Sequence, residues 1–170
     1  MTRNDTTPEA TDIVLLLALL ATARFLPFPM QFSPFLALTL ASGYLLRSSL
    51  FGVLALALFL ATDAVLGPHG QSWLTTAFFA ALLAGGSLAR SLPAMVVHGV
   101  VGITAFYLVS NTVLVFQGPW YPHDASGVLA SLVAGYPFYQ AQMLGLAAVV
   151  VALAAASPAA RRTHAVPATH

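Results

Sequence analysis

Residues 61–73 have the sequence ATDAVLGPHGQSW, and this stretch decides how the rest of the chain is interpreted. A long apolar run ends here and carries one acid, Asp63, about one helical turn before the Gly-Pro-His-Gly loop. Ser72 then begins a second apolar run. An ionisable group inside a membrane span costs about 2.5–3.5 kcal/mol on insertion scales, so such a residue is a functional candidate. The stretch therefore predicts two membrane helices joined by a tight turn, with a candidate site beside it.

The composition is typical of an integral membrane protein. Of the 170 residues, 59% are hydrophobic and 6% are charged, and the mean hydropathy is +0.86. A soluble domain is about 25% charged. The net charge of +1 gives no basis for nucleic-acid binding, and the absence of cysteine excludes disulfides and thiolate chemistry. The sequence shows no catalytic triad, phosphate loop or carboxylate pair, so we expect no enzymatic activity, no metal and no cofactor.

Apolar runs and their punctuation predict an all-α, polytopic integral membrane bundle of about six transmembrane helices. We expect a polar tail over residues 1–11, a transmembrane domain over 12–156 and a disordered tail over 157–170. The segment 127–135 is too short to span and is expected at the interface or as a re-entrant piece, and Pro137 is expected to open the last span. The predicted spans are roughly 12–27, 34–46, 50–66, 72–89, 93–116 and 137–156.

The arginines indicate an orientation for these spans. With six spans and the N-terminus inside, five of the six basic residues fall on the cytoplasmic side, and only Arg24 falls outside. This is the bias that the positive-inside rule describes, so we expect both termini to be cytoplasmic. The five are Arg3, Arg47, Arg90, Arg161 and Arg162.

The same assignment gathers polar and aromatic residues at the outer ends of the spans, whereas the inner side receives little beyond arginines and small residues. A polar, aromatic-rich mouth on an apolar bundle predicts a site that captures a molecule from outside. The alternative is an interfacial aromatic belt with ordinary loop polarity. The outer set comprises Arg24, Gln31, Asp63, His69, Gln71, Trp73, Asn111, Gln117, Trp120, Tyr121, His123, Asp124, Tyr136, Tyr139 and Gln140.

Several polar residues within the spans have two interpretations each. Arg24 and Asp63 are expected near the outer ends of the first and third spans, where they either form a structural clamp or face a ligand. Asn111 either hydrogen-bonds between helices or contacts a ligand. His98 either hydrogen-bonds to a neighbouring helix, which we favour, or ligates a pigment or haem.

Small residues recur every four positions in three of the predicted spans. Such stripes let helices approach closely in lipid. We expect them to pack within the bundle, and the alternative is a flat face for a partner helix. The stripes are Ala37 and Ala41, Ala57 and Ala61, and Ala77, Ala81, Gly85 and Ala89.

Four motifs carry a resemblance to a known family: RFLPFPMQFSP (24–34), ATDAVLGPHGQSW (61–73), SNTVLVFQGPWYP (110–122) and YPFY (136–139). They resemble DUF6580, an uncharacterised family of small bacterial integral membrane proteins that is similar to the S components of energy-coupling factor (ECF) vitamin transporters. The resemblance implies a six-helix, S-component-like fold in the bacterial inner membrane. It also implies a vitamin-like substrate bound at the outer face, a coupling membrane protein and ATPases. The last span departs from the family pattern, in which Arg-Asn-Thr and a later acid are expected after the Pro-aromatic pair. This chain has Gln140, Ala141, Gln142 and Leu146 there.

These observations predict an integral membrane, substrate-binding subunit for uptake of a vitamin or similar small molecule captured at the outer face. The segment 25–34 is expected to close over the bound molecule. The alternative is a structural accessory subunit of a larger membrane complex. The predicted partners are the lipid bilayer and a small molecule, with the ECF proteins implied by the resemblance. The predicted ligand-binding residues are Arg24, Asp63, His69, Trp73, Asn111, Trp120 and Tyr121.

Overall fold

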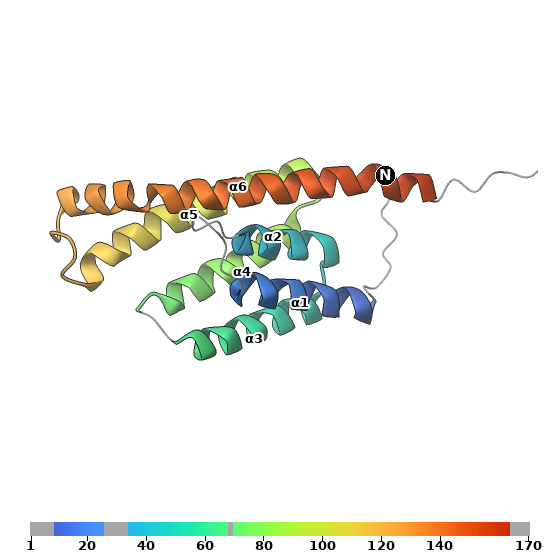
Figure 1. Cartoon of the computed structure of the whole chain (residues 1–170), viewed down its shortest axis with the longest axis horizontal. Coiled ribbons are helices and arrows are strands. Elements are labelled where there is room, and N and C mark those ends of the chain that lie inside the picture. Colours follow the sequence, from blue (N-terminus) through green and yellow to red (C-terminus); the bar gives the residue numbers. More distant parts are fainter. Residues whose placement is uncertain (1–8, 26–33, 68–69, 164–170) are drawn as a thin grey trace, which may run out of the picture.

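All regular secondary structure in the described part of the chain is α-helix, as the sequence predicts. A computed structural model of the protein describes residues 9–25, 34–67 and 70–163. These residues form six helices and no strand (Figure 1). The helices are α1 (Ala10–Phe25), α2 (Phe35–Leu46), α3 (Ser49–Leu66), α4 (Ser72–Leu88), α5 (Leu92–Gln117) and α6 (Ala125–Thr163).

Local sequence explains where most of these helices begin and end. The side chain of Ser48 accepts a hydrogen bond from the backbone N–H of Phe51, and so caps the N-terminus of α3. Ser91 caps α5 in the same way through the N–H of Ala94. Gly67 ends α3 with a φ of 94°, a left-handed conformation that glycine adopts without steric cost.

The C-terminal third of the chain differs from the prediction. Residues 127–135 are not a separate interfacial or re-entrant segment, and Pro137 does not open a helix, because both lie inside the single 39-residue helix α6. This helix begins after Asp124, whose carboxylate accepts hydrogen bonds from the backbone N–H groups of Ser126 and Gly127 at 2.9 and 3.1 Å. α6 also continues past residue 156, to Thr163.

Within residues 9–25, 34–67 and 70–163, three helices, rather than the expected six, are long and apolar enough to cross a membrane by themselves. They are α3, α5 and the part of α6 over Ala125–Ala156, with 18, 26 and 32 residues. Helices α2 and α4 are apolar but have only 12 and 17 residues. At 1.5 Å per residue they extend about 18 and 26 Å, and the hydrocarbon core of a bilayer is about 30 Å thick.

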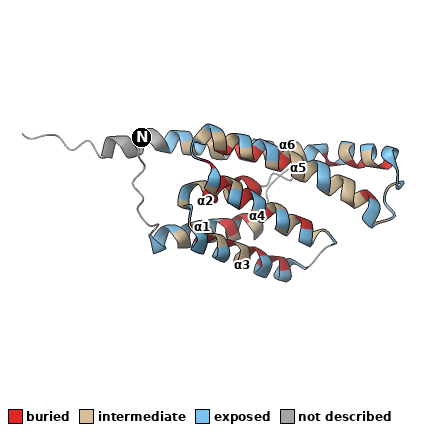
Figure 2. Ribbon diagram, turned by 180° about the vertical axis from the view of Figure 1, so that it is seen from behind, coloured by how far each residue is buried: buried red, intermediate tan, exposed pale blue. Residues whose placement is uncertain are grey.

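The short helix α2 lies at the centre of the molecule. It packs against α1, α4, α5 and α6, with α1 and α3 on one side and the α5–α6 hairpin on the other (Figure 1). Eight of its twelve residues are buried. The outer helices instead carry many exposed residues (Figure 2). Among these, Val53, Val101 and Val133 are 67%, 62% and 67% exposed.

Two glycines allow α2 and α4 to touch through their backbones. A Cβ atom at Gly43 would clash with the carbonyl oxygen of Leu83, and one at Gly86 would clash with that of Leu40. The predicted small-residue stripes divide between two environments. Ala37, Ala41 and Ala89 are buried, whereas Ala57, Ala61, Ala77 and Ala81 are exposed. Only part of the stripes therefore packs within this chain.

The alternation of the helices sorts their ends into two groups. The last residues of α1, α3 and α5 lie at the same end of the molecule as the first residues of α2, α4 and α6 (Figure 1). The links after α2 and α4 lie at the opposite end, where the guanidinium of Arg47 donates a hydrogen bond to the carbonyl oxygen of Ala89. Arg24 and Asp63 thus lie at the end opposite to Arg47 and Arg90, as the arginine pattern predicts.

Candidate functional site

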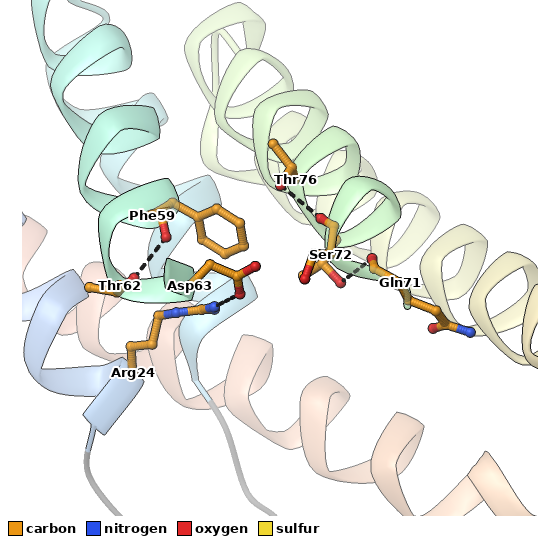
Figure 3. A network of polar contacts seen from close by, with 8 residues as sticks. Arg24, Phe59, Thr62, Asp63, Gln71, Ser72 and Thr76 are labelled. Atoms are coloured by element: carbon orange, nitrogen blue, oxygen red, sulfur yellow. Dashed lines mark hydrogen bonds and ion pairs between the residues drawn. The ribbon is translucent and has the colours of Figure 1, made fainter. Parts of the chain in front are cut away.

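The centre of the candidate site is an ion pair between the last turn of α1 and the last turns of α3. The Nη2 atom of Arg24 donates a hydrogen bond to the Oδ1 atom of Asp63 (Figure 3). Both side chains are largely buried, with 14% and 9% of their surfaces exposed. The sequence left pairing and ligand contact as alternatives for these two residues, and the structure shows the pair.

The Arg24 guanidinium lies against two rings of a cluster of three stacked phenylalanines. Its carbon Cζ lies 4.3 Å from the ring centroid of Phe59 and 5.4 Å from that of Phe35. Phe59 and Phe79 stack with ring centroids 4.6 Å apart, and Phe35 stacks on both. A cation over an aromatic face is stabilised by the ring quadrupole. These rings were not predicted as part of the site, although Phe59 precedes Asp63 by four residues and so shares its helix face.

A small cavity lies beside the guanidinium. Its volume is about 10 Å³, and Arg24, Phe35, Phe59, Thr62 and Phe79 are among its lining residues. The Nε atom of Arg24 is buried, and no hydrogen-bond partner for it is found among the described residues. A cavity of roughly 10–15 Å³ holds one water molecule. The polar atom and the space beside it therefore fit a single bound water.

A larger, open groove lies on the other side of Asp63, between the last turns of α3 and the first turns of α4. Its volume is about 630 Å³. The groove combines one carboxylate, two hydroxyl groups and an indole ring on an otherwise apolar wall, and Figure 3 shows Ser72 and Thr76 on the turns of α4 that face Asp63. Its lining residues are Leu60, Asp63, Ala64, Ser72, Trp73 and Thr76.

The described residues of the α3–α4 connection are attached to α5. The side-chain Nε2 of Gln71 donates to the carbonyl oxygen of Ser110 at 2.9 Å. The Nε2 of Gln117 donates to the carbonyl oxygen of Gly70 at 3.3 Å. These bonds hold the start of α4, and with it one wall of the groove, against the end of α5. The predicted site residue His69 and the predicted closing segment, apart from its ends, lie outside the described residues.

Asn111 lies away from the groove, at the contact between α5 and α6. Its Nδ2 donates to the carbonyl oxygen of Tyr107 at 2.8 Å, and the hydroxyl of Ser131 donates to its backbone oxygen at 3.0 Å. A Cβ atom at Gly135 would clash with the Asn111 amide. The Asn111 amide therefore lies in the contact between α5 and α6, and it is not among the residues that line the groove.

Trp120 and Tyr121 lie in the connection between α5 and α6. Trp120 is 77% exposed and packs against Gly118. Neither residue lines the groove. The structure thus brings Arg24, Asp63 and Trp73 together at the α1, α3 and α4 ends, and leaves Asn111, Trp120 and Tyr121 on the α5–α6 hairpin.

His98 forms the interhelical hydrogen bond that the sequence favours for it. Its Nδ1 lies 2.7 Å from the carbonyl oxygen of Gly85 in α4. Among the described residues, no three His, Cys, Asp or Glu side chains are grouped as ligands for a metal ion.

Comparisons with known proteins identify a family and no individual relative. No curated protein and no solved structure matches the chain. One family model matches residues 4–168, almost the whole length. The chain therefore belongs to DUF6580, a family of unknown function.

Proposed function

We propose that the protein is an integral membrane, substrate-binding subunit of the S-component type, which captures a vitamin or similar small molecule at the outer face. The observation that supports it most is the groove of about 630 Å³ beside the buried Arg24–Asp63 pair. Ligand sites are concave and mostly apolar, with a few polar groups that fix orientation. The carboxylate, hydroxyls and indole of this groove are groups of that kind.

The surface of the molecule supports placement in a bilayer. Apolar side chains are exposed along α1, α3, α5 and α6. Contact of so large an apolar surface with water is unfavourable in free energy, whereas contact with lipid is not. In the part of the chain that the structure describes, three helices are long and apolar enough to span a membrane. We place the Arg47 and Arg90 end in the cytoplasm of a bacterial cell, with both termini there, and the groove end outside the inner membrane.

Release of the molecule into the cell requires a second step. The sequence shows no nucleotide-binding motif that could supply energy for this step. An S component obtains its energy from a coupling membrane protein and ATPases. We propose the same partners here, together with the lipid bilayer. In this scheme the ligand enters the groove from outside, and the bundle tilts against the coupling protein to release it inside.

The experiment is native mass spectrometry of protein purified in mild detergent from its own host. We expect a small molecule bound in stoichiometric amount to the native protein and lost from Asp63→Asn. The matched control is Asp12→Asn, because Asp12 is exposed in the first turn of α1 and should leave binding unchanged. Equal ligand occupancy in both variants would contradict the assignment of the groove.

One observation favours a second function, that of a structural accessory subunit. Ala57, Ala61, Ala77 and Ala81 are exposed on the neighbouring helices α3 and α4, so these small residues do not pack within the chain. Small residues at a helix surface let another membrane helix approach closely. Co-elution of one protein partner and no small molecule in the same measurement would favour this function.

A further inference from the structure

We infer that the groove selects an electrically neutral, ring-bearing molecule that donates N–H or O–H hydrogen bonds. This inference rests on the proposed function and assigns the substrate class of the same groove. Three features of the described residues lead to it. They are the balance of charge at Asp63, the acceptor role of the Thr76 hydroxyl, and the apolar walls of the groove.

The charge of the groove is already balanced within the protein. The carboxylate of Asp63 lines the groove, and its positive partner Arg24 lies directly behind it. Both side chains are more than four-fifths buried, so water screens the pair only weakly. The opposite charges of this pair largely cancel their attraction for an ion in the groove, so a charged ligand of either sign gains little to offset the loss of its own hydration. A neutral ligand avoids that cost.

Two polar groups of the groove, the Asp63 carboxylate and the Thr76 hydroxyl, are hydrogen-bond acceptors. The hydroxyl of Thr76 donates its hydrogen to the carbonyl oxygen of Ser72 at 2.7 Å, so its lone pairs remain to accept. An ionised carboxylate such as that of Asp63 is an acceptor only. A ligand that bonds to these two groups supplies the donors, as primary amides, ring N–H groups and hydroxyls do.

The remaining walls favour a flat, apolar body. Leu60, Ala64 and Trp73 complete the lining of the groove. The indole of Trp73 is 60% exposed, so one of its faces is available for stacking. Stacked aromatic pairs gain about 0.5–1.5 kcal/mol beyond the area that they bury. Ring and donor together describe a neutral aromatic amide or a similar heterocycle.

The test uses three probes of nearly equal shape and different charge: benzamide, benzoate and benzamidinium, near neutral pH. Binding to the purified full chain in detergent is followed by tryptophan fluorescence, and Trp73→Phe shows which part of the signal comes from the groove. Because the chain has two tryptophans, the remaining Trp120 serves as the internal reference. We expect benzamide to bind more tightly than either ion, by on the order of tenfold.

Two variants test whether charge balance is the cause. Asp63→Asn leaves Arg24 as an uncompensated cation, so the preference should change from benzamide to benzoate by on the order of tenfold. The double variant Arg24→Gln/Asp63→Asn is neutral again and should regain the preference for benzamide. It also serves as the folding control if the single variant is too unstable to purify.

The outcomes separate this inference from the proposed function. Tighter binding of benzamidinium or benzoate than of benzamide, with a signal that is lost in Trp73→Phe, would overturn neutral selection and leave a binding groove in place. A preference for benzamide that persists in Asp63→Asn would also overturn it. No saturable response to any of the three probes would count against both.

Discussion

At the scale of single residues, the main feature of the structure is the buried ion pair between Arg24 and Asp63. Arg24 and Asp63 satisfy each other across two helices, and Phe59 covers the guanidinium face. Replacing such a pair by apolar residues is often neutral in free energy, whereas removing one partner leaves a buried charge alone. The pair therefore ties α1 to α3 only as long as both members are present.

Asp63→Ala tests this dependence. We expect the free energy of unfolding to fall by about 3 kcal/mol, because the Arg24 guanidinium loses the carboxylate that balances its charge while remaining largely buried. Unfolding by denaturing detergent, followed by circular dichroism, gives the measurement. The control Asp12→Ala changes an exposed residue of α1 and should stay within about 0.5 kcal/mol of the native chain. Equal losses in the two variants would show that the pair contributes little.

Asp124 provides a prediction about pH. Hydrogen bonds from the Ser126 hydroxyl and from the backbone N–H groups of Gly127 and Ser126 hold the pKa of Asp124 below its ordinary value. A lowered pKa in the folded state means that the cap stabilises α6 above the unfolded-state pKa. That stabilisation is lost as the pH falls through the folded-state pKa.

The measurement is thermal unfolding of the native chain and of Asp124→Asn from neutral to acidic pH. Asparagine also caps helices but carries no charge, so the variant should lose less stability on acidification than the native chain. Parallel curves for the two proteins would contradict the role of the carboxylate.

At the scale of elements, the helix ends that are set by local Ser, Pro and Gly residues were predicted well. Ser91, followed by Leu92 and Pro93, starts α5 within one residue of the expected position, because a serine cap and an early proline act locally. Gly67 ends α3 as expected. Pro137 was misleading, because neighbouring structure can tolerate a proline inside a membrane helix. The signal that decides this region is the cap at Asp124.

The contact between α2 and α4 was only partly predictable. The four-residue spacing of small residues marks both helices, but the closest approach is at Gly43 and Gly86. Spacing alone does not tell which face of a helix turns inward, since Ala77 and Ala81 follow the same rule and are exposed. Tertiary packing decides between the two faces.

Gly86→Ala tests the close approach of α2 and α4. The added Cβ would clash with the carbonyl oxygen of Leu40, and this backbone atom cannot move aside as a side chain can. We expect the variant to lose about 2 kcal/mol of unfolding free energy. Gly52→Ala is the matched control, because its Cβ would meet only a Leu83 methyl group at 3.8 Å. Alanine there should be neutral or stabilising by up to about 1 kcal/mol.

At the scale of the whole molecule, Arg47 and Arg90 lie at the end opposite to the groove. The sequence predicted this separation because charges at span ends follow the alternation of the helices, which requires no tertiary detail. It did not predict which polar residues would share a groove. Asn111 and Trp73 were predicted at the same outer face, but Asn111 is engaged between α5 and α6 and Trp73 lines the groove.

Single cysteines test the orientation, and the chain offers a background without cysteine. We expect Ala125→Cys, at the exposed start of α6, to react with an impermeant maleimide in intact cells. Ser49→Cys, exposed at the start of α3, should react only after lysis. Labelling of both residues from the same side would contradict the alternation, and the reverse pattern would invert the orientation.

The position of α2 has a consequence for how the protein is made. Its twelve residues are too short to cross the bilayer alone, and the helices α4, α5 and α6 that bury it are synthesised after it. The insertion machinery therefore receives an apolar segment that is too short to span the bilayer, before the helices that later pack against it have been synthesised. We expect α2 to settle only when α4 leaves the ribosome, so that assembly in the membrane is completed late rather than helix by helix.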